Sequence, residues 1–109
     1  MRDTDPDKAV DYILKHSTKF AEAKAGRVYL EEYRKSLKAI LMTRSTESAV
    51  TAQERDAYAH DEYQQLLLEF KNAVFLEEKL RWDLIAAQAR VEIWRTKSAN
   101  DRAEGKATL

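Results

Sequence analysis

The stretch LLLEFKNAVFLEEKLRWDLIAAQARVEIW, residues 66–94, decides the fold. Alternating steps of four and three residues along it meet an apolar side chain at every position but one, over four heptads. These positions are Leu66, Phe70, Ala73, Glu77, Leu80, Leu84, Ala87, Val91 and Trp94. The pattern is typical of a helix packed lengthwise on a partner. Glu77, the one interruption, is expected either to meet a cationic partner or to fix the register of the pairing.

A partner for this helix is predicted earlier in the chain. A segment from about residue 18 to 44 carries a second seam with the same spacing, formed by Gly26, Leu30, Tyr33, Leu37 and Ile40. Glycine costs about 1 kcal/mol relative to alanine inside a helix. Gly26 therefore marks either a close approach of a neighbour or a weak point.

Shorter helices and loops surround these two segments. Asp5 and Pro6 are typical of a helix start, and a short helix is expected from there to about residue 16, with a possible restart at residues 17–18. Residues 43–50 lack periodicity and predict a loop. Thr51 and Glu54 have the spacing of a capping box, and the helix that they begin is expected to end near residue 59. Asp61 is then expected to cap the long last helix.

The last helix is expected to run over about residues 61–103, with Gly105 ending it. Residues 1–5 and 104–109 are predicted to be disordered. The fold class that follows is all-α: one domain over residues 1–109, built as a long antiparallel helical hairpin or coiled-coil-like bundle with short extra helices.

A second apolar stripe lies on the last helix, roughly opposite the seam. It comprises Phe75, Trp82, Ala86, Ala89 and Ile93. A helix with two apolar faces is sandwiched between neighbours, and the remaining helices are too short to cover the second face fully. We therefore expect a homo-oligomer in which hairpins pair through this stripe.

Composition excludes several classes of protein. The chain has 19 basic and 19 acidic residues in 109, so a polybasic arm or acidic tail is excluded. Without cysteine it has no disulfide and no thiolate metal site. No apolar run approaches the roughly 20 residues of a membrane span, and the N-terminus does not resemble a secretory signal. A soluble, cytoplasmic protein is expected.

Local charge is less even than the total. Acidic side chains dominate residues 54–78, whereas basic ones gather on the 18–44 segment and toward the C-terminus. Candidate phosphate contacts are Arg27, Arg34, Lys38, Arg90 and Arg95. Trp94 beside Arg95 has the composition of a base-stacking site, although its place on the seam favours a core role.

No enzymatic chemistry is predicted. The two histidines, His16 and His60, lie far apart and lack the spacing of a zinc helix, and His60 is best interpreted as a capping or surface residue. The chain has neither a glycine-rich phosphate loop nor a nucleophile motif. It is therefore expected to act without a metal, cofactor or small-molecule substrate.

Three strings resemble a family of small phage and prophage proteins: RVYLEEYRKSLK (27–38), AYAH (57–60) and LRWDLIAAQAR (80–90). Members of this family are mostly uncharacterised, and many are encoded among replication and recombination genes. The resemblance, over about residues 20–102, brings no catalytic motif. It implies a phage protein in the host cytoplasm that acts beside recombination or annealing proteins.

Three functions remain open at this point. The first is an accessory protein of DNA recombination or replication, an oligomeric helical scaffold that binds single-stranded DNA, a recombination or annealing protein, or both. The second is an adaptor or inhibitor of a host factor that binds no nucleic acid and acts through the face around Phe75, Trp82 and Ile93. The third is a structural part of the virion.

Overall fold

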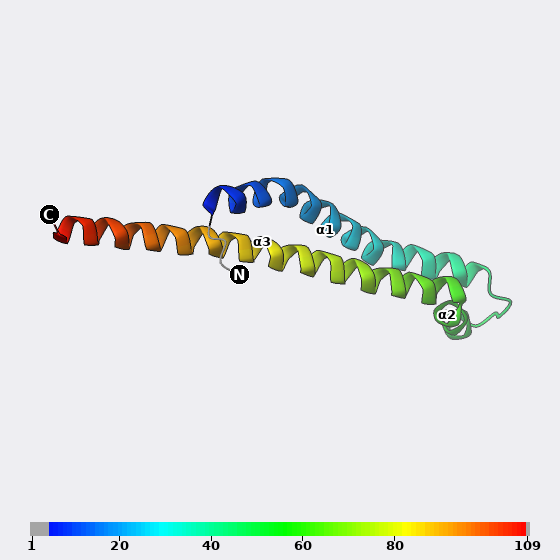
Figure 1. The fold of residues 1–109 in the computed structure, drawn as a ribbon. Helices are drawn as coiled ribbons and strands as arrows, with labels where there is room; N and C mark the ends of the chain where they lie inside the picture. The colour runs from blue at the N-terminus through cyan, green and yellow to red at the C-terminus, as the bar shows by residue number, and fades with distance from the viewer. Residues whose placement is uncertain (1–4, 109) are drawn as a thin grey trace. The chain divides into compact units, whose positions relative to one another are not determined.

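The computed structural model describes residues 5–108, with side chains to residue 106, and this part of the chain consists of helices and the short loops between them. Its elements are α1 (Pro6–Thr43), α2 (Val50–Ala59) and α3 (Asp61–Thr108), and Figure 1 shows α2 at the turn that joins the long helices. The all-α prediction, with two long helices packed as a hairpin and a short extra helix, is confirmed. The loop before α2 and the bend at His60 also lie where the sequence predicted them.

The chain forms two compact units, and α1 and α3 contribute to both. One unit contains residues 22–77, and we call it the α2 unit because it contains α2. The other combines residues up to 21 with those from 78 onward, and we call it the terminal unit.

The core of the α2 unit joins all three helices. It contains Leu37 and Leu41 from α1, Ala57 from α2, and Tyr63 and Leu66 from α3. Every one of these side chains is less than a tenth exposed. Burial of these apolar groups is the main force that holds the three helices together.

Two ion pairs fix the direction of the long helices in the α2 unit. Arg27 of α1 meets Glu77, whereas Arg44, the residue directly after α1, meets Glu62, which lies earlier in α3. As residue numbers rise along α1, the contacted residue numbers fall along α3. The helices therefore run antiparallel in this unit.

The terminal unit has a thinner core. Ala9 and Ala87 are its buried apolar residues among those described. Tyr12 stacks on His16 with a ring separation of 3.8 Å, and the pKa of the Tyr12 hydroxyl is raised by burial and then by the nearby Asp83 carboxylate. Because both buried residues are alanines, little apolar surface is removed from water in this unit.

The packed face of α1 differs from the predicted seam. It comprises Ala9, Ile13, His16, Phe20, Ala23, Arg27, Leu30, Arg34, Leu37 and Leu41, all buried or half-buried. Leu30 and Leu37 were predicted correctly, but Gly26, Tyr33 and Ile40 are exposed. Each lies one residue before a true seam position. Two of those seam positions are Arg27 and Arg34, which a pattern of apolar residues does not include.

Gly26 lies on the exposed face of α1, and a Cβ atom built on it meets nothing within 4 Å. The close-approach interpretation is therefore wrong, and Gly26 is a weak point of the helix. We expect Gly26→Ala to stabilise the protein by about 0.5–1 kcal/mol, since alanine restricts the unfolded chain and favours the helix. Urea unfolding followed by circular dichroism measures the gain; an unchanged or lower midpoint would contradict it.

Several helix ends differ from the predictions. α1 has no break at residues 17–18, where the Ser17 hydroxyl donates to the Leu14 carbonyl within the helix. α2 begins after Ala49 without a side-chain cap, so the predicted capping box does not form. At α3, His60 rather than Asp61 caps the helix, because its Nδ1 accepts from the Glu62 amide at 3.1 Å.

The two chain ends also bear on the predictions. Asp5 caps α1, accepting from the Asp7 amide at 2.9 Å. α3 continues through Gly105 to Thr108 instead of ending at the glycine. Residues 1–4 and 109, part of the segments predicted to be disordered, lie outside the described residues.

Candidate anion-binding site

Arg27, one of the predicted phosphate contacts, is committed to the helix pair instead. Its Nε donates to Glu77 at 2.7 Å and its Nη2 donates to the same carboxylate at 3.3 Å, while Nη1 donates to Glu31 at 2.8 Å. The Glu77 hydrogen bonds hold the pKa of the guanidinium above its ordinary value. Glu77 is 8% exposed, and its ion pair with Arg27 confirms the expectation that it meets a cationic partner.

Two other predicted contacts, Arg34 and Lys38, come together in a cavity of the α2 unit. The cavity has a volume of about 410 Å³ and is lined by Arg34, Lys35, Lys38, Tyr58 and Tyr63. The cations project from successive turns of α1, because residues four apart lie on one helix face. The tyrosines come from the two sides of the α2–α3 bend. We call this the basic cavity.

Lys38 is held in place by its neighbours. Its Nζ lies 4.8 Å from the centre of the Tyr58 ring and 3.8 Å from Glu54. A hydrogen bond with Tyr58 and then the charge of Glu54 raise the pKa of the Lys38 ammonium, and partial burial opposes them. Lys38 therefore keeps its charge throughout the neutral range, and a cation resting on a tyrosine ring is favourable in its own right.

Arg34 differs from every other cation of the cavity. It is half-buried on the packed face of α1, and within residues 5–108 its guanidinium has no carboxylate partner. Lys35, by contrast, is exposed and pairs with Glu32 at 3.1 Å. A guanidinium presents several donors in a fixed plane, which suits a phosphate or carboxylate oxygen pair.

The tyrosines were missed by the sequence reasoning. Tyr58 and Tyr63 pack edge-to-face with ring centres 5.2 Å apart. Tyr63 is 7% exposed and belongs to the core, whereas Tyr58 is 43% exposed and offers aromatic surface beside the cations. The sequence signal that could have identified them is their position, one on each side of the predicted bend at His60.

The remaining predicted cations, Arg90 and Arg95, belong to the terminal unit. Both are exposed, and Arg95 pairs with Glu92 at 3.1 Å. Trp94 is 43% exposed, so the expected core role for it is wrong. Tyr12 on α1 interacts with Asp83 on α3, and α1 begins at Pro6. In an antiparallel pair, α3 beyond about residue 90 has therefore passed the start of α1.

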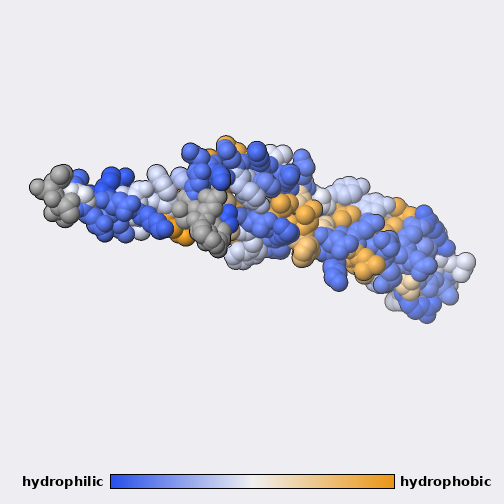
Figure 2. Space-filling model, in the orientation of Figure 1, coloured by the Kyte–Doolittle hydropathy of each residue, from blue (hydrophilic) through white to orange (hydrophobic). Residues whose placement is uncertain are grey.

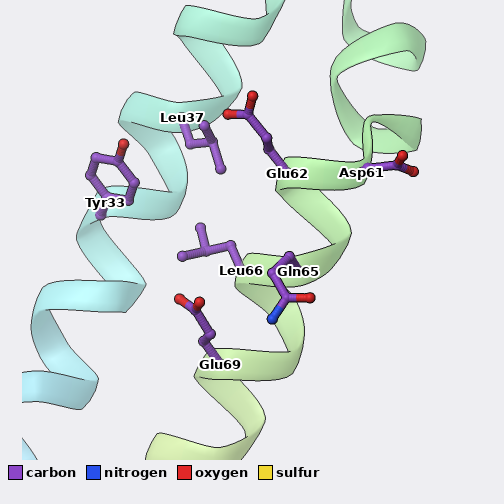
Figure 3. A pocket seen from close by; sticks show the side chains of 7 residues that line it. All are labelled: Tyr33, Leu37, Asp61, Glu62, Gln65, Leu66 and Glu69. Carbon is purple, nitrogen blue, oxygen red and sulfur yellow. The ribbon is translucent and has the colours of Figure 1, made fainter.

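A second cavity in the α2 unit, about 440 Å³, has the opposite charge. It takes no residue from α2 and is lined by Tyr33, Leu37, Asp61, Glu62, Gln65, Leu66 and Glu69. Figure 3 shows Leu37 and Leu66 pointing toward each other between the helices, with carboxylates around them. Glu62 is engaged by Arg44 at 2.9 Å. This surface repels phosphate. No group of three metal-ligating His, Asp or Glu side chains occurs among the described residues.

The predicted oligomer face lies on the surface. Phe75 is 69% exposed, Trp82 61% and Ile93 49%, and Ala86 and Ala89 are exposed as well. Figure 2 shows a largely hydrophilic surface with hydrophobic residues exposed at several places on one face of the molecule. Within a single copy these side chains remain in water, which is unusual for aromatic groups of this size.

No family model, curated protein or solved structure matches the chain. In the described part of the chain, no helix is long and apolar enough to cross a membrane. The assignment of function therefore depends on the cavities and the exposed faces.

Proposed function

We propose that this protein binds single-stranded DNA through the basic cavity, as an accessory factor of phage recombination or replication in the host cytoplasm. The observation that supports this most is Arg34, a half-buried residue whose guanidinium has no carboxylate partner in the described chain, beside Lys38 and the exposed Tyr58. Phosphate oxygens satisfy the cations, and a tyrosine beside them offers a base a stacking surface. The resemblance to phage proteins encoded near recombination genes favours DNA as the polymer.

One cavity contacts few phosphates, so a single copy binds weakly. Assembly into a homo-oligomer through the apolar stripe of α3 places several basic cavities on one strand and multiplies their affinities. Self-association is therefore part of the proposal. A recombination or annealing protein is the partner that such a scaffold would serve.

Fluorescence anisotropy of a labelled oligothymidylate at low salt tests this function. We expect Arg34→Gln with Lys38→Gln to weaken binding by about tenfold or more, since two phosphate contacts are lost. The matched control, Arg55→Gln with Arg102→Gln, removes the same charge from exposed positions outside the cavity and should change affinity by less than about twofold. Binding should also weaken as salt rises.

Absence of binding by the unaltered protein at low salt would overturn the proposal. Equal losses in the two double variants would overturn the cavity as the site, since they would indicate attraction by overall charge alone.

The adaptor alternative uses a different observation, the exposure of Trp82 and Ile93. A host protein with an apolar groove would cover this face without any nucleic acid. Two kinds of variant distinguish these functions. Substitutions in the basic cavity leave an adaptor's binding to its host protein unchanged, whereas Trp82→Ala abolishes that binding.

A further inference from the structure

The exposed apolar residues of α3 in the terminal unit are arranged symmetrically. We use the name α3 stripe for Trp82, Ala86, Ala89 and Ile93. Their spacing is four, three and four residues, which is the same when followed in either direction. The two large side chains lie at the ends and the two small ones in the middle. A second copy turned by a two-fold axis at the middle therefore meets the stripe with complementary positions.

We propose that the α3 stripe is covered by the α3 stripe of a second copy, running antiparallel. Trp82 of one copy lies against Ile93 of the other, and Ala86 against Ala89. The alanines let the helices approach closely at the centre, while the large side chains fill the space at both ends. This rests on the self-association in the proposed function and adds the orientation of the two chains.

The charges beside the stripe favour this occupant and this direction. Arg90 is exposed and forms no ion pair within the described residues. In the antiparallel arrangement it lies at the edge of the interface near Asp83 of the second copy. The Asp83 carboxylate already accepts from Lys79 at 2.9 Å, and that hydrogen bond lowers the Asp83 pKa, so the carboxylate is ionised. Arg90 then completes a network across the interface.

A parallel arrangement of the same stripes brings like charges together. Lys79, one heptad before Ala86, would face Lys79 of the second copy. Glu78 would lie beside Asp83 of that copy, since side chains five residues apart meet across a parallel pair. In the antiparallel arrangement Lys79 faces Thr96 instead. Repulsion between like charges in one alignment is a usual means by which paired helices select the other alignment.

Sedimentation equilibrium of the full chain tests the pairing. We expect Trp82→Glu to raise the dimer dissociation constant by about 100-fold, because a charge replaces an aromatic side chain at the interface. The matched control is Leu14→Glu, at an apolar position on α1 that is 69% exposed, against 61% for Trp82. It should leave the dimer intact. A monomer for the unaltered protein at micromolar concentration, or equal effects of the two variants, would overturn the proposal.

A distance measurement tests the direction. Because the chain contains no cysteine, Arg102→Cys, at an exposed position outside the α3 stripe, offers a single attachment point for a nitroxide label. Antiparallel pairing separates the two labelled helix positions by about 44 Å along the axis, since each lies about 14.5 residues from the centre at 1.5 Å per residue. Parallel pairing brings them to about 10 Å. The shorter distance would overturn the antiparallel arrangement.

Failure here is distinguishable from failure of the proposed function. Oligothymidylate binding by the Trp82→Glu monomer reports the basic cavity alone, and it is expected to persist at reduced affinity. If the protein dimerises but binds no DNA, the proposed interface stands and the proposed function is overturned. If it is a monomer that binds DNA, the proposed function stands and the proposed interface is overturned.

Discussion

Leu41→Ala is expected to lower the free energy of unfolding by about 3 kcal/mol, the largest effect of any single substitution considered. Leu41 is 2% exposed and packs in the core where α1, α2 and α3 meet. Truncation removes apolar contacts and leaves a cavity that the helices fill only in part. Urea unfolding followed by circular dichroism measures the loss.

The control for this prediction is Leu14→Ala, which makes the same chemical change at a side chain that is 69% exposed. It should shift the free energy of unfolding by less than about 0.5 kcal/mol. Similar losses in the two variants would mean that the core around Leu41 does not stabilise the fold.

Replacing Glu77 with alanine is expected to destabilise the protein by about 2 kcal/mol. The substitution leaves Arg27 on the packed face of α1 without the carboxylate that accepts two of its hydrogen bonds. Removal of one member of a buried or half-buried pair costs more than the pair itself contributes, because the remaining charge is poorly solvated.

A double variant distinguishes this explanation from simple loss of packing. Arg27→Leu with Glu77→Leu replaces the ion pair by an apolar contact and is expected to recover most or all of the stability. A full double-mutant cycle in urea provides the coupling between the two residues. Additive losses, with no recovery in the double variant, would contradict a direct interaction.

The sequence predicted the elements of the fold well because the hydrophobic period on α3 is nearly uninterrupted. The face from Leu66 to Val91 is the packed face, as predicted. On α1 the prediction was displaced by one residue, because Arg27 and Arg34 occupy seam positions and an apolar pattern excludes arginine. Glu77, an acidic residue on the seam of α3, indicated that a cation lies opposite it on α1.

The candidate site was only half predictable. Arg34 and Lys38 follow from helical spacing, since they share one face of α1. Tyr58 lines the same cavity because the chain bends at His60. This is a tertiary arrangement, and the local sequence periodicity does not predict it. Arg27 was assigned to phosphate because its partner lies 50 residues away along the chain.

The small size of the core has a further consequence. Seven hydrophobic residues are buried among those described, and Ala9, Ala57 and Ala87 account for three of them. Alanines contribute little transfer free energy, so the folded single copy has a narrow margin over the unfolded chain. Anything that binds only the folded state, whether DNA or a second copy, therefore raises the melting temperature by mass action. Under the proposed pairing of two copies, resistance to proteolysis in the cell would therefore increase with the concentration of the protein itself.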